Sequence, residues 1–80
     1  MSGGQGRGTE ATQLMVRYGF EELGLHKIEL RVWSYNQRAI RSYTKAGFVI
    51  EGVRRAVAFH AGVFHDEVLM GILAEEYGAT

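Results

Sequence analysis

The sequence predicts one small α+β domain with the order helix, strand, helix, strand, strand, in which the last two strands form an antiparallel hairpin. Three observations lead to this prediction. Two segments have the apolar spacing of helices, and each ends at a glycine, Gly24 or Gly47. Between them, residues 27–33 alternate in the manner of a half-buried strand. After Gly47 the apolar period changes to two, and Ala61-Gly62 marks a hairpin turn.

Length and composition limit the kind of protein. The 80 residues form one domain at most, and so short a chain buries only about 60% of its unfolded surface. Apolar residues make up 46% of it, which is high for a stable monomer, and self-association would cover the surplus. There is no cysteine and the three histidines lack the spacing of metal ligands, so we predict no metal site.

Charge and hydropathy exclude two further classes of partner. Nine basic residues balance nine acidic ones, which argues against a nucleic-acid binder, and Arg54-Arg55 is too short a basic run to change this. No apolar run approaches a membrane-spanning length and no signal peptide is visible, so we expect a cytoplasmic protein without a membrane partner.

Residues 4–24 combine a glycine-rich segment with a helix. Gly4, Gly6 and Gly8 let backbone N–H groups converge on an anion, and the helix that follows adds unpaired N–H groups at its start. Gly8 or Thr9 would cap this helix. The pattern indicates a phosphate or pyrophosphate site, and a flexible glycine-rich terminus is the alternative.

This first helix carries a broad apolar face that we expect to pack in the core. Leu14, Met15 and Tyr18 follow helical spacing, and Val16 and Phe20 widen the face. The helix is expected to end near Leu23, with Gly24 as its left-handed cap.

The remaining elements follow from period and capping. In the strand over residues 27–33, the side chains at 28, 30 and 32 face one way and those at 29, 31 and 33 the other. Asn36 is a suitable cap for a helix over residues 37–46, on whose inner face Tyr43 lies. Strands over residues 48–60 and 63–73 and a short tail complete the chain.

Several segments, taken in order, resemble the GNAT superfamily of N-acetyltransferases. Residues 4–11 are similar to its acyl-CoA pyrophosphate loop, residues 24–32 to the strand after the CoA-binding helix, and residues 36–48 to the next segment with its Asn, Ala, Tyr and Gly-Phe. Glu51-Gly52 and the part from Gly62 to Met70 are similar to the ribosomal-protein N-terminal acetyltransferase branch. The resemblance covers nearly all of residues 1–80, which we treat as a single truncated domain.

The resemblance implies that this chain is the C-terminal half of an acyl-CoA N-acyltransferase fold. Family members are normally much longer, and their first half supplies the strand that precedes the glycine loop. Here only Met1-Ser2-Gly3 precedes it. The strand Lys27–Trp33 then lacks its usual neighbour, and since an unpaired apolar strand is an association site, we expect a homodimer through it.

The resemblance also implies a cofactor and site residues. The donor would be acetyl-CoA and the acceptor an amine that the sequence does not identify. Tyr43 matches the acid that protonates the leaving thiolate, which a phenol suits because its acidity is close to that of a thiol. Residues matching the cofactor contacts are Gln5, Gly6, Arg7, Gly8, Thr9 and Asn36.

Alternatives remain for each of these roles. Asn36 would look identical as a helix cap, and Tyr43 as a core residue. No general base is identifiable, although Glu29 could face the substrate side, and His60 and His65 are expected to be exposed polar residues beside the turn. Two functions are therefore open: an acetyltransferase whose site is completed by dimerisation, or a non-catalytic CoA-binding or dimerisation module.

Overall fold

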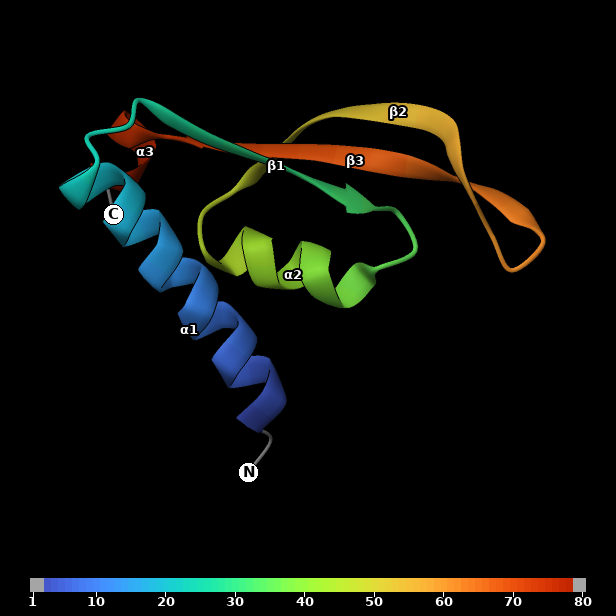
Figure 1. The fold of residues 1–80 in the computed structure, drawn as a ribbon, viewed down its shortest axis with the longest axis horizontal. Coiled ribbons are helices and arrows are strands. Elements are labelled where there is room, and N and C mark those ends of the chain that lie inside the picture. Colours follow the sequence, from blue (N-terminus) through green and yellow to red (C-terminus); the bar gives the residue numbers. More distant parts are fainter. Residues whose placement is uncertain (1–2, 79–80) are drawn as a thin grey trace.

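A computed structural model describes the backbone of residues 3–78 and the side chains of residues 10–78. Two helices lie against one face of a three-stranded sheet, and a short third helix lies at its end (Figure 1). The elements are α1 (Gly3–Arg17), continued by a π-helical turn η1 (Tyr18–Glu22), then β1 (Lys27–Trp33), α2 (Gln37–Lys45), β2 (Val49–His60), β3 (Val63–Leu73) and α3 (Ala74–Gly78). This α+β order confirms the predicted half of the fold.

The sheet is antiparallel and its strand order is β1-β3-β2. β3 is central: it pairs with β1 from Lys27 opposite Leu73 to Trp33 opposite Glu67, and with β2 on its other side. The β2–β3 register shifts between Arg54 and Ala58. Within residues 3–78, β1 and β2 are therefore the edges of the sheet.

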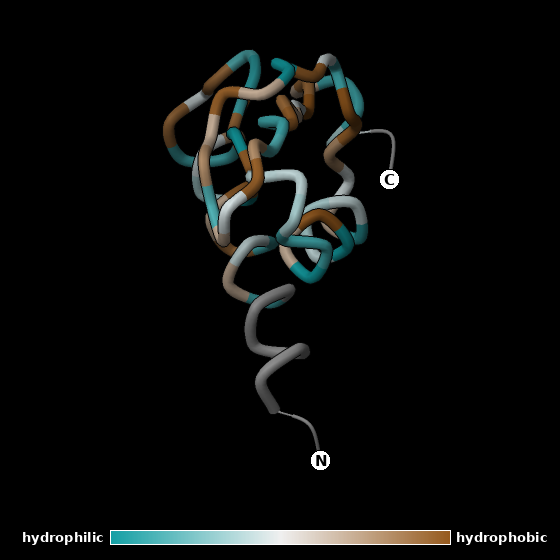
Figure 2. Tube along the Cα trace, turned by 90° about the vertical axis from the view of Figure 1, so that its right-hand side faces the viewer, coloured by the Kyte–Doolittle hydropathy of each residue, from teal (hydrophilic) through white to brown (hydrophobic). Residues whose placement is uncertain are grey.

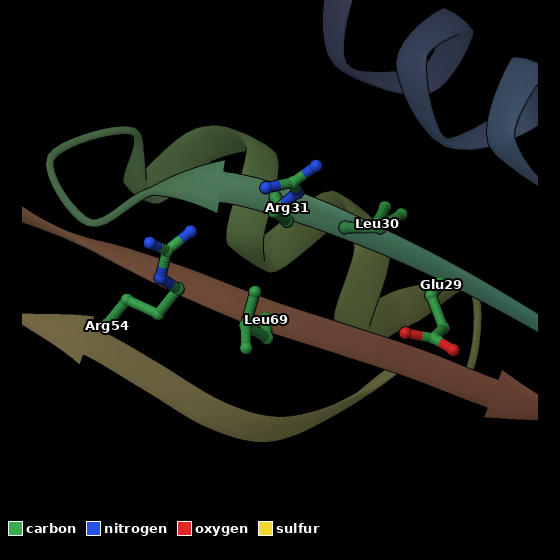
Figure 3. Close-up of a pocket in the computed structure, with 5 residues that line it drawn as sticks. All are labelled: Glu29, Leu30, Arg31, Arg54 and Leu69. Carbon is green, nitrogen blue, oxygen red and sulfur yellow. The ribbon is translucent and has the colours of Figure 1, made fainter. Parts of the chain in front are cut away.

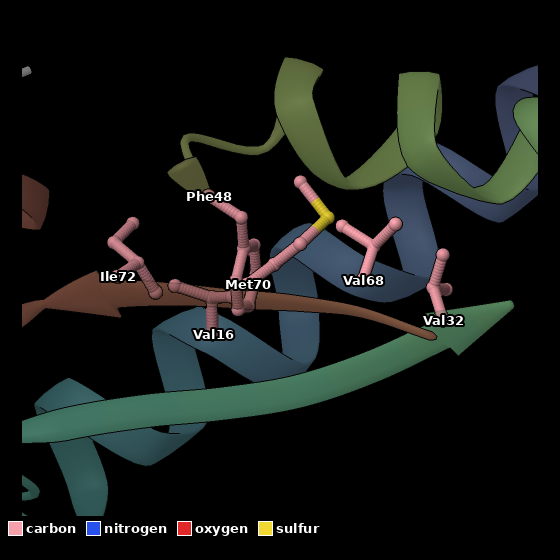
Figure 4. Packing of buried hydrophobic residues seen from close by; sticks show 6 residues of the cluster. All are labelled: Val16, Val32, Phe48, Val68, Met70 and Ile72. Atoms are coloured by element: carbon pink, nitrogen blue, oxygen red, sulfur yellow. The ribbon is translucent and has the colours of Figure 1, made fainter. Parts of the chain in front are cut away.

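The core lies between this sheet and the helices (Figure 4). Alternation along β3 points Val68, Met70 and Ile72 toward the helices, where they lie beside Val32 of β1. Val16 of α1 and Phe48, which precedes β2, complete the cluster, and both are only 1% exposed. The inner face of α2 packs against it through Ala39, Ile40 and Tyr43.

The predicted packing of α1 is wrong in part. Leu14 and Tyr18 are 64% and 57% exposed, and Met15 is also exposed, while the buried line runs through Thr12, Val16 and Gly19. These residues are spaced by three or four positions, so they form one narrow line on the helix. Apolar periodicity showed a wide face, and it cannot tell which line within that face meets the sheet. Figure 2 shows hydrophobic residues spread along the described trace.

Gly19 lets the end of the first helix approach β1 closely. A Cβ there would lie 2.8 Å from Cδ1 of Ile28. The helix then ends as predicted at Gly24, whose φ of +67° favours glycine, and the N–H of Leu25 donates to the carbonyl of Gly19 at 3.0 Å.

Both ends of the chain are more helical than expected. α1 begins at Gly3, so the glycine segment that we expected as a loop has a helical backbone, because each added residue gains one backbone hydrogen bond once a helix has formed. The expected tail forms α3, whose start is stabilised by a hydrogen bond from the Leu73 N–H to the Glu76 carboxylate at 2.8 Å. Tyr77 of α3 stacks on Phe20 and donates a hydrogen bond to Glu21, which raises its pKa above the ordinary tyrosine value.

Two methionines provide a matched test of this packing. Met70→Ala should lower the free energy of unfolding by about 2–5 kcal/mol, because the deletion leaves a cavity in the core. Met15→Ala should change it by no more than about 0.5 kcal/mol, because Met15 is 49% exposed. Urea unfolding followed by circular dichroism measures both, and an equal loss for the two variants would contradict this assignment of the core.

Candidate functional site

Asn36 caps the helix that carries the predicted acid. Its Oδ1 accepts a hydrogen bond from the Ala39 N–H at 3.2 Å, which satisfies one of the unpaired donors at the start of α2. The Gln37 side chain donates to the Ser34 carbonyl at 2.6 Å and closes the same turn. The predicted capping role of Asn36 is confirmed, and its contact with the CoA arm stays a prediction.

Tyr43 lies two turns further along α2, on the same face of the helix as Asn36. The two residues are seven positions apart, which places them about 10 Å apart along the helix axis and nearly in line. The Tyr43 ring is half-buried and meets Phe48 edge-on, with centroids 5.7 Å apart. The structure thus aligns both predicted residues of α2 on one side of it.

The other predicted cofactor residues belong to the first turns of α1. The backbone of Gln5, Gly6, Arg7, Gly8 and Thr9 is helical, and their side chains lie outside the described residues. In Figure 1 the amino-terminal end of α1 projects away from the sheet, while the rest of α1 passes alongside α2. The pyrophosphate-binding role of this segment therefore stays a prediction.

The loop before α2 is fixed to the β2–β3 hairpin. The Ser34 N–H donates to the Asp66 carbonyl at 2.8 Å, and the Asp66 N–H donates to the Ser34 hydroxyl at 3.1 Å. Tyr35 stacks on His60 with ring centroids 4.5 Å apart and meets His65 edge-on at 4.7 Å. The position of Asn36 at the start of α2 therefore depends on this contact with the hairpin.

His65 and Asp66 have structural roles that the sequence did not specify. The Asp66 carboxylate accepts a hydrogen bond from the Ala56 N–H at 2.9 Å, and Ala56 lies in the irregular part of β2 with a φ of +53°. A positive φ in alanine is strained, so this bond stabilises the bulge. His60 is exposed as predicted, but the prediction is wrong for His65, which is half-buried. The contact of both rings with Tyr35 was also missed, because a partner 25 or more residues away leaves no local pattern.

Charged side chains cover the sheet face that is opposite α2. Glu67 of β3 is 7% exposed and lies 3.2 Å from Arg54 and 4.0 Å from Arg31. Toward the other end of the face, Lys27 lies 3.0 Å from Glu51 and 3.9 Å from Glu29. The hydrogen bond to Glu51 is the main reason why the pKa of Lys27 lies above its ordinary value. The sequence did not predict this network of ion pairs. Its only indication was that residues 29, 31 and 67 take outward positions.

Glu29 lies on this outer face, and the sheet separates it from Tyr43. Odd positions of β1 point away from the helices, whereas Tyr43 packs on the inner face. The structure therefore does not bring the candidate base and the candidate acid together.

Neither a metal site nor a membrane span is found in the described part of the chain. Among these residues no group of three or more histidine, aspartate or glutamate side chains could hold a metal ion. No described helix is long and apolar enough to cross a membrane.

Curated proteins similar to this chain are N-acetyltransferases. The spermidine N(1)-acetyltransferase of Escherichia coli (strain K12) is 36% identical over 74 residues, which are 92% of this chain and 40% of that protein. A probable N-acetyltransferase of Bacillus subtilis (strain 168) is 43% identical over 70 residues, which are 88% of this chain and 39% of that protein. The chain thus spans about two fifths of the length of these relatives.

Solved structures show the same fold. A mutant spermidine N-acetyltransferase from Vibrio cholerae superposes with a TM-score of 0.83 at 36% identity, over 95% of this chain and 45% of that one. A GNAT-family acetyltransferase from Bacillus anthracis gives a TM-score of 0.74 at 33% identity, over 84% and 40% of the two chains. The closer assignment to the ribosomal-protein N-terminal branch stays a prediction.

One family model matches more than half of this chain. It is described as the acetyltransferase (GNAT) domain and covers residues 2–49, which include α1, β1 and α2. Together with the fold, this match shows that the chain belongs to the GNAT family of acetyltransferases.

Proposed function

We propose that this protein takes part in the transfer of an acetyl group from acetyl-CoA to an amine in the cytoplasm. The observation that carries the proposal is the match of α1, β1 and α2 to the family, with Asn36 and Tyr43 aligned on α2. The relatives named as spermidine acetyltransferases make a polyamine the first acceptor to test.

The donor set of this chain fits the cofactor at two places. Asn36 is exposed at the amino end of α2, where amide groups and unpaired N–H groups can meet a polar arm. Tyr43 is half-buried, and its ring is held edge-on by Phe48. The first turn of α1, which lies in the glycine segment, would supply its unpaired backbone N–H groups to the pyrophosphate.

When bound, acetyl-CoA supplies an acyl thioester that an amine can attack. In this step the amine nitrogen forms a bond to the carbonyl carbon, the C–S bond breaks, and the surplus proton of the amine passes to water or a base. Tyr43 would give its hydroxyl proton to the departing sulfur and would regain a proton from water, so that no free thiolate has to form. Phe48 and the core hold the phenol in place for this transfer.

Cofactor binding tests the glycine segment. Titration calorimetry should show saturable heat with acetyl-CoA, and Gly8→Val should abolish it, because a β-branched side chain blocks the approach of phosphate to the backbone. Arg7→Ala is the matched variant and should weaken binding only about two- to fivefold, because backbone N–H groups would make most of the contacts with the pyrophosphate. An absence of heat with the unmodified chain at high acetyl-CoA concentration would overturn the proposed cofactor site.

Turnover tests Tyr43. Release of CoA thiol from acetyl-CoA in the presence of spermidine should fall about 100-fold in Tyr43→Phe, because the variant keeps the ring and loses the proton donor. The melting temperature and the acetyl-CoA affinity of this variant should be unchanged. Equal turnover in both proteins would remove Tyr43 from the reaction.

We also propose that two copies associate through β1. Its side away from β3 has no strand partner among residues 3–78, and alternate N–H and C=O groups along that edge can pair with a second strand. Light scattering after size exclusion should give the mass of a dimer at micromolar concentration. A monomer under these conditions would exclude this association.

A non-catalytic CoA-binding or dimerisation module is the second candidate. The observation that favours it is that the sheet separates Tyr43, the candidate acid, from Glu29, the candidate base. Such a module would bind acetyl-CoA without releasing thiol from it, so the calorimetric and turnover measurements together separate the two candidates.

A further inference from the structure

The outer face of the sheet contains a pocket of about 430 Å³ that has no part in the proposed acetyl transfer. It is lined by Glu29, Leu30 and Arg31 of β1, Arg54 of β2 and Leu69 of β3. Figure 3 shows Arg54 toward one end of the pocket and Glu29 toward the other, with Leu69 between them and Arg31 beside Leu69. Because Tyr43 and Asn36 belong to α2 on the opposite face, the pocket is a separate site.

Two glycines leave a depression in the outer face of the sheet beside Leu69. Leu69 stands opposite Gly52 of β2, and Gly71 follows it on the same face opposite Glu29. Because glycine has no side chain, neither residue covers the Leu69 side chain, which therefore forms the apolar floor of the pocket. A Cβ at Gly71 would lie 2.8 Å from the Glu51 carboxylate, so a larger residue there would displace the end of the Glu51 side chain.

The arginine end of the pocket carries surplus positive charge. Arg31 and Arg54 both approach the same oxygen of Glu67, so two guanidinium groups share one carboxylate. Glu67 is buried beneath them, whereas their side chains are 64% and 56% exposed. Each guanidinium has five N–H donors in a planar fork, so donors remain available to bind a second carboxylate from solvent.

The opposite end carries surplus negative charge. Lys27 is shared by Glu51 at 3.0 Å and Glu29 at 3.9 Å, so one ammonium group balances two carboxylates. Glu29 has the longer contact, and its side chain is 71% exposed. It is therefore the carboxylate that can accept a further ammonium group at the rim of the pocket.

We propose that this pocket binds a short aliphatic zwitterion, with its carboxylate against Arg31 and Arg54 and its ammonium group against Glu29. Arg31 and Glu29 are two residues apart on one strand, so their side chains leave the same face from Cα atoms about 7 Å apart. An ω-amino acid or a dipeptide has charges at this separation, and its apolar middle would lie on Leu69. The site is independent of the acetyl-transfer proposal, and either can fail without the other.

Three probes of equal chain length separate the contributions of the two ends. In NMR titrations at constant ionic strength, 6-aminohexanoate should shift the Nε–H signals of Arg31 and Arg54 and the amide signals of β1 around Glu29. Its affinity should be about fivefold higher than that of hexanoate or hexylamine, as expected for one additional exposed ion pair. Equal affinities for the three probes, or no shifts with any of them, would overturn the proposal.

Variants locate the site and control for general charge effects. Glu29→Gln should reduce the affinity for 6-aminohexanoate about fivefold and should not weaken hexanoate binding, since only the ammonium contact is lost. Arg54→Gln should weaken both ligands, and Arg41→Gln, an exposed arginine of α2, should weaken neither. Because Glu29 is largely exposed, its variant should fold even if Arg54→Gln loses stability.

Two further outcomes would also reject the site. Loss of hexanoate affinity in Glu29→Gln would show that the ligand does not lie as proposed. Shifts at Arg54 of β2, which lies away from the β1 edge, that depend on protein concentration without any probe would assign this face to a second copy of the chain.

Discussion

The alternation of side chains along β3 is the constraint on which the rest of the structure depends. β3 is hydrogen-bonded to both other strands, so its period of two sets the two faces of the whole sheet. Val68, Met70 and Ile72 define the inner face and bring α1 and α2 against it. Glu67 and Leu69 define the outer face. A shift of one residue in this register would bury Glu67 beneath the helices and expose Met70, which explains why a seven-residue pairing with β1 is regular throughout.

Much of this fold was predictable because its signals are local. Each of these signals comes from residues only a few positions apart. The structure has the features that they predicted: the strand Lys27–Trp33, the caps at Gly24 and Asn36 and the turn at Ala61-Gly62. The buried line of α1 was not predictable, since Val16 and Leu14 are equally apolar and only the sheet decides between them. The helical backbone of the glycine segment was not predicted, because the segment resembles the pyrophosphate loop of the family. That it directly precedes a helix was the only sign that the helix could extend through it.

The candidate site divides in the same way. Asn36 and Tyr43 came from one short segment whose spacing the α2 helix preserves. The contacts of Ser34 and Tyr35 with the hairpin and the ion pairs around Glu67 join residues that are far apart in sequence. They could be predicted only from the strand order and register. Resemblance to a family identified residues on the inner side of the molecule and was silent about the outer face.

The contacts of Ser34 and Tyr35 with the hairpin give β2 and β3 a role in positioning α2. Ser34 exchanges two hydrogen bonds with Asp66, and Tyr35 lies against rings from both arms of the hairpin, immediately before the cap at Asn36. The start of α2 is thereby held from the far end of β2 and β3, while Tyr43 at its other end is held by Phe48 at the near end of β2. A helix fixed at both ends to the same pair of strands cannot slide along the sheet without breaking one of these contacts. The distance between Asn36 and Tyr43 is set by α2 itself, whereas the place of both residues against the sheet, which any acyl donor would meet, is set by the contacts with β2 and β3.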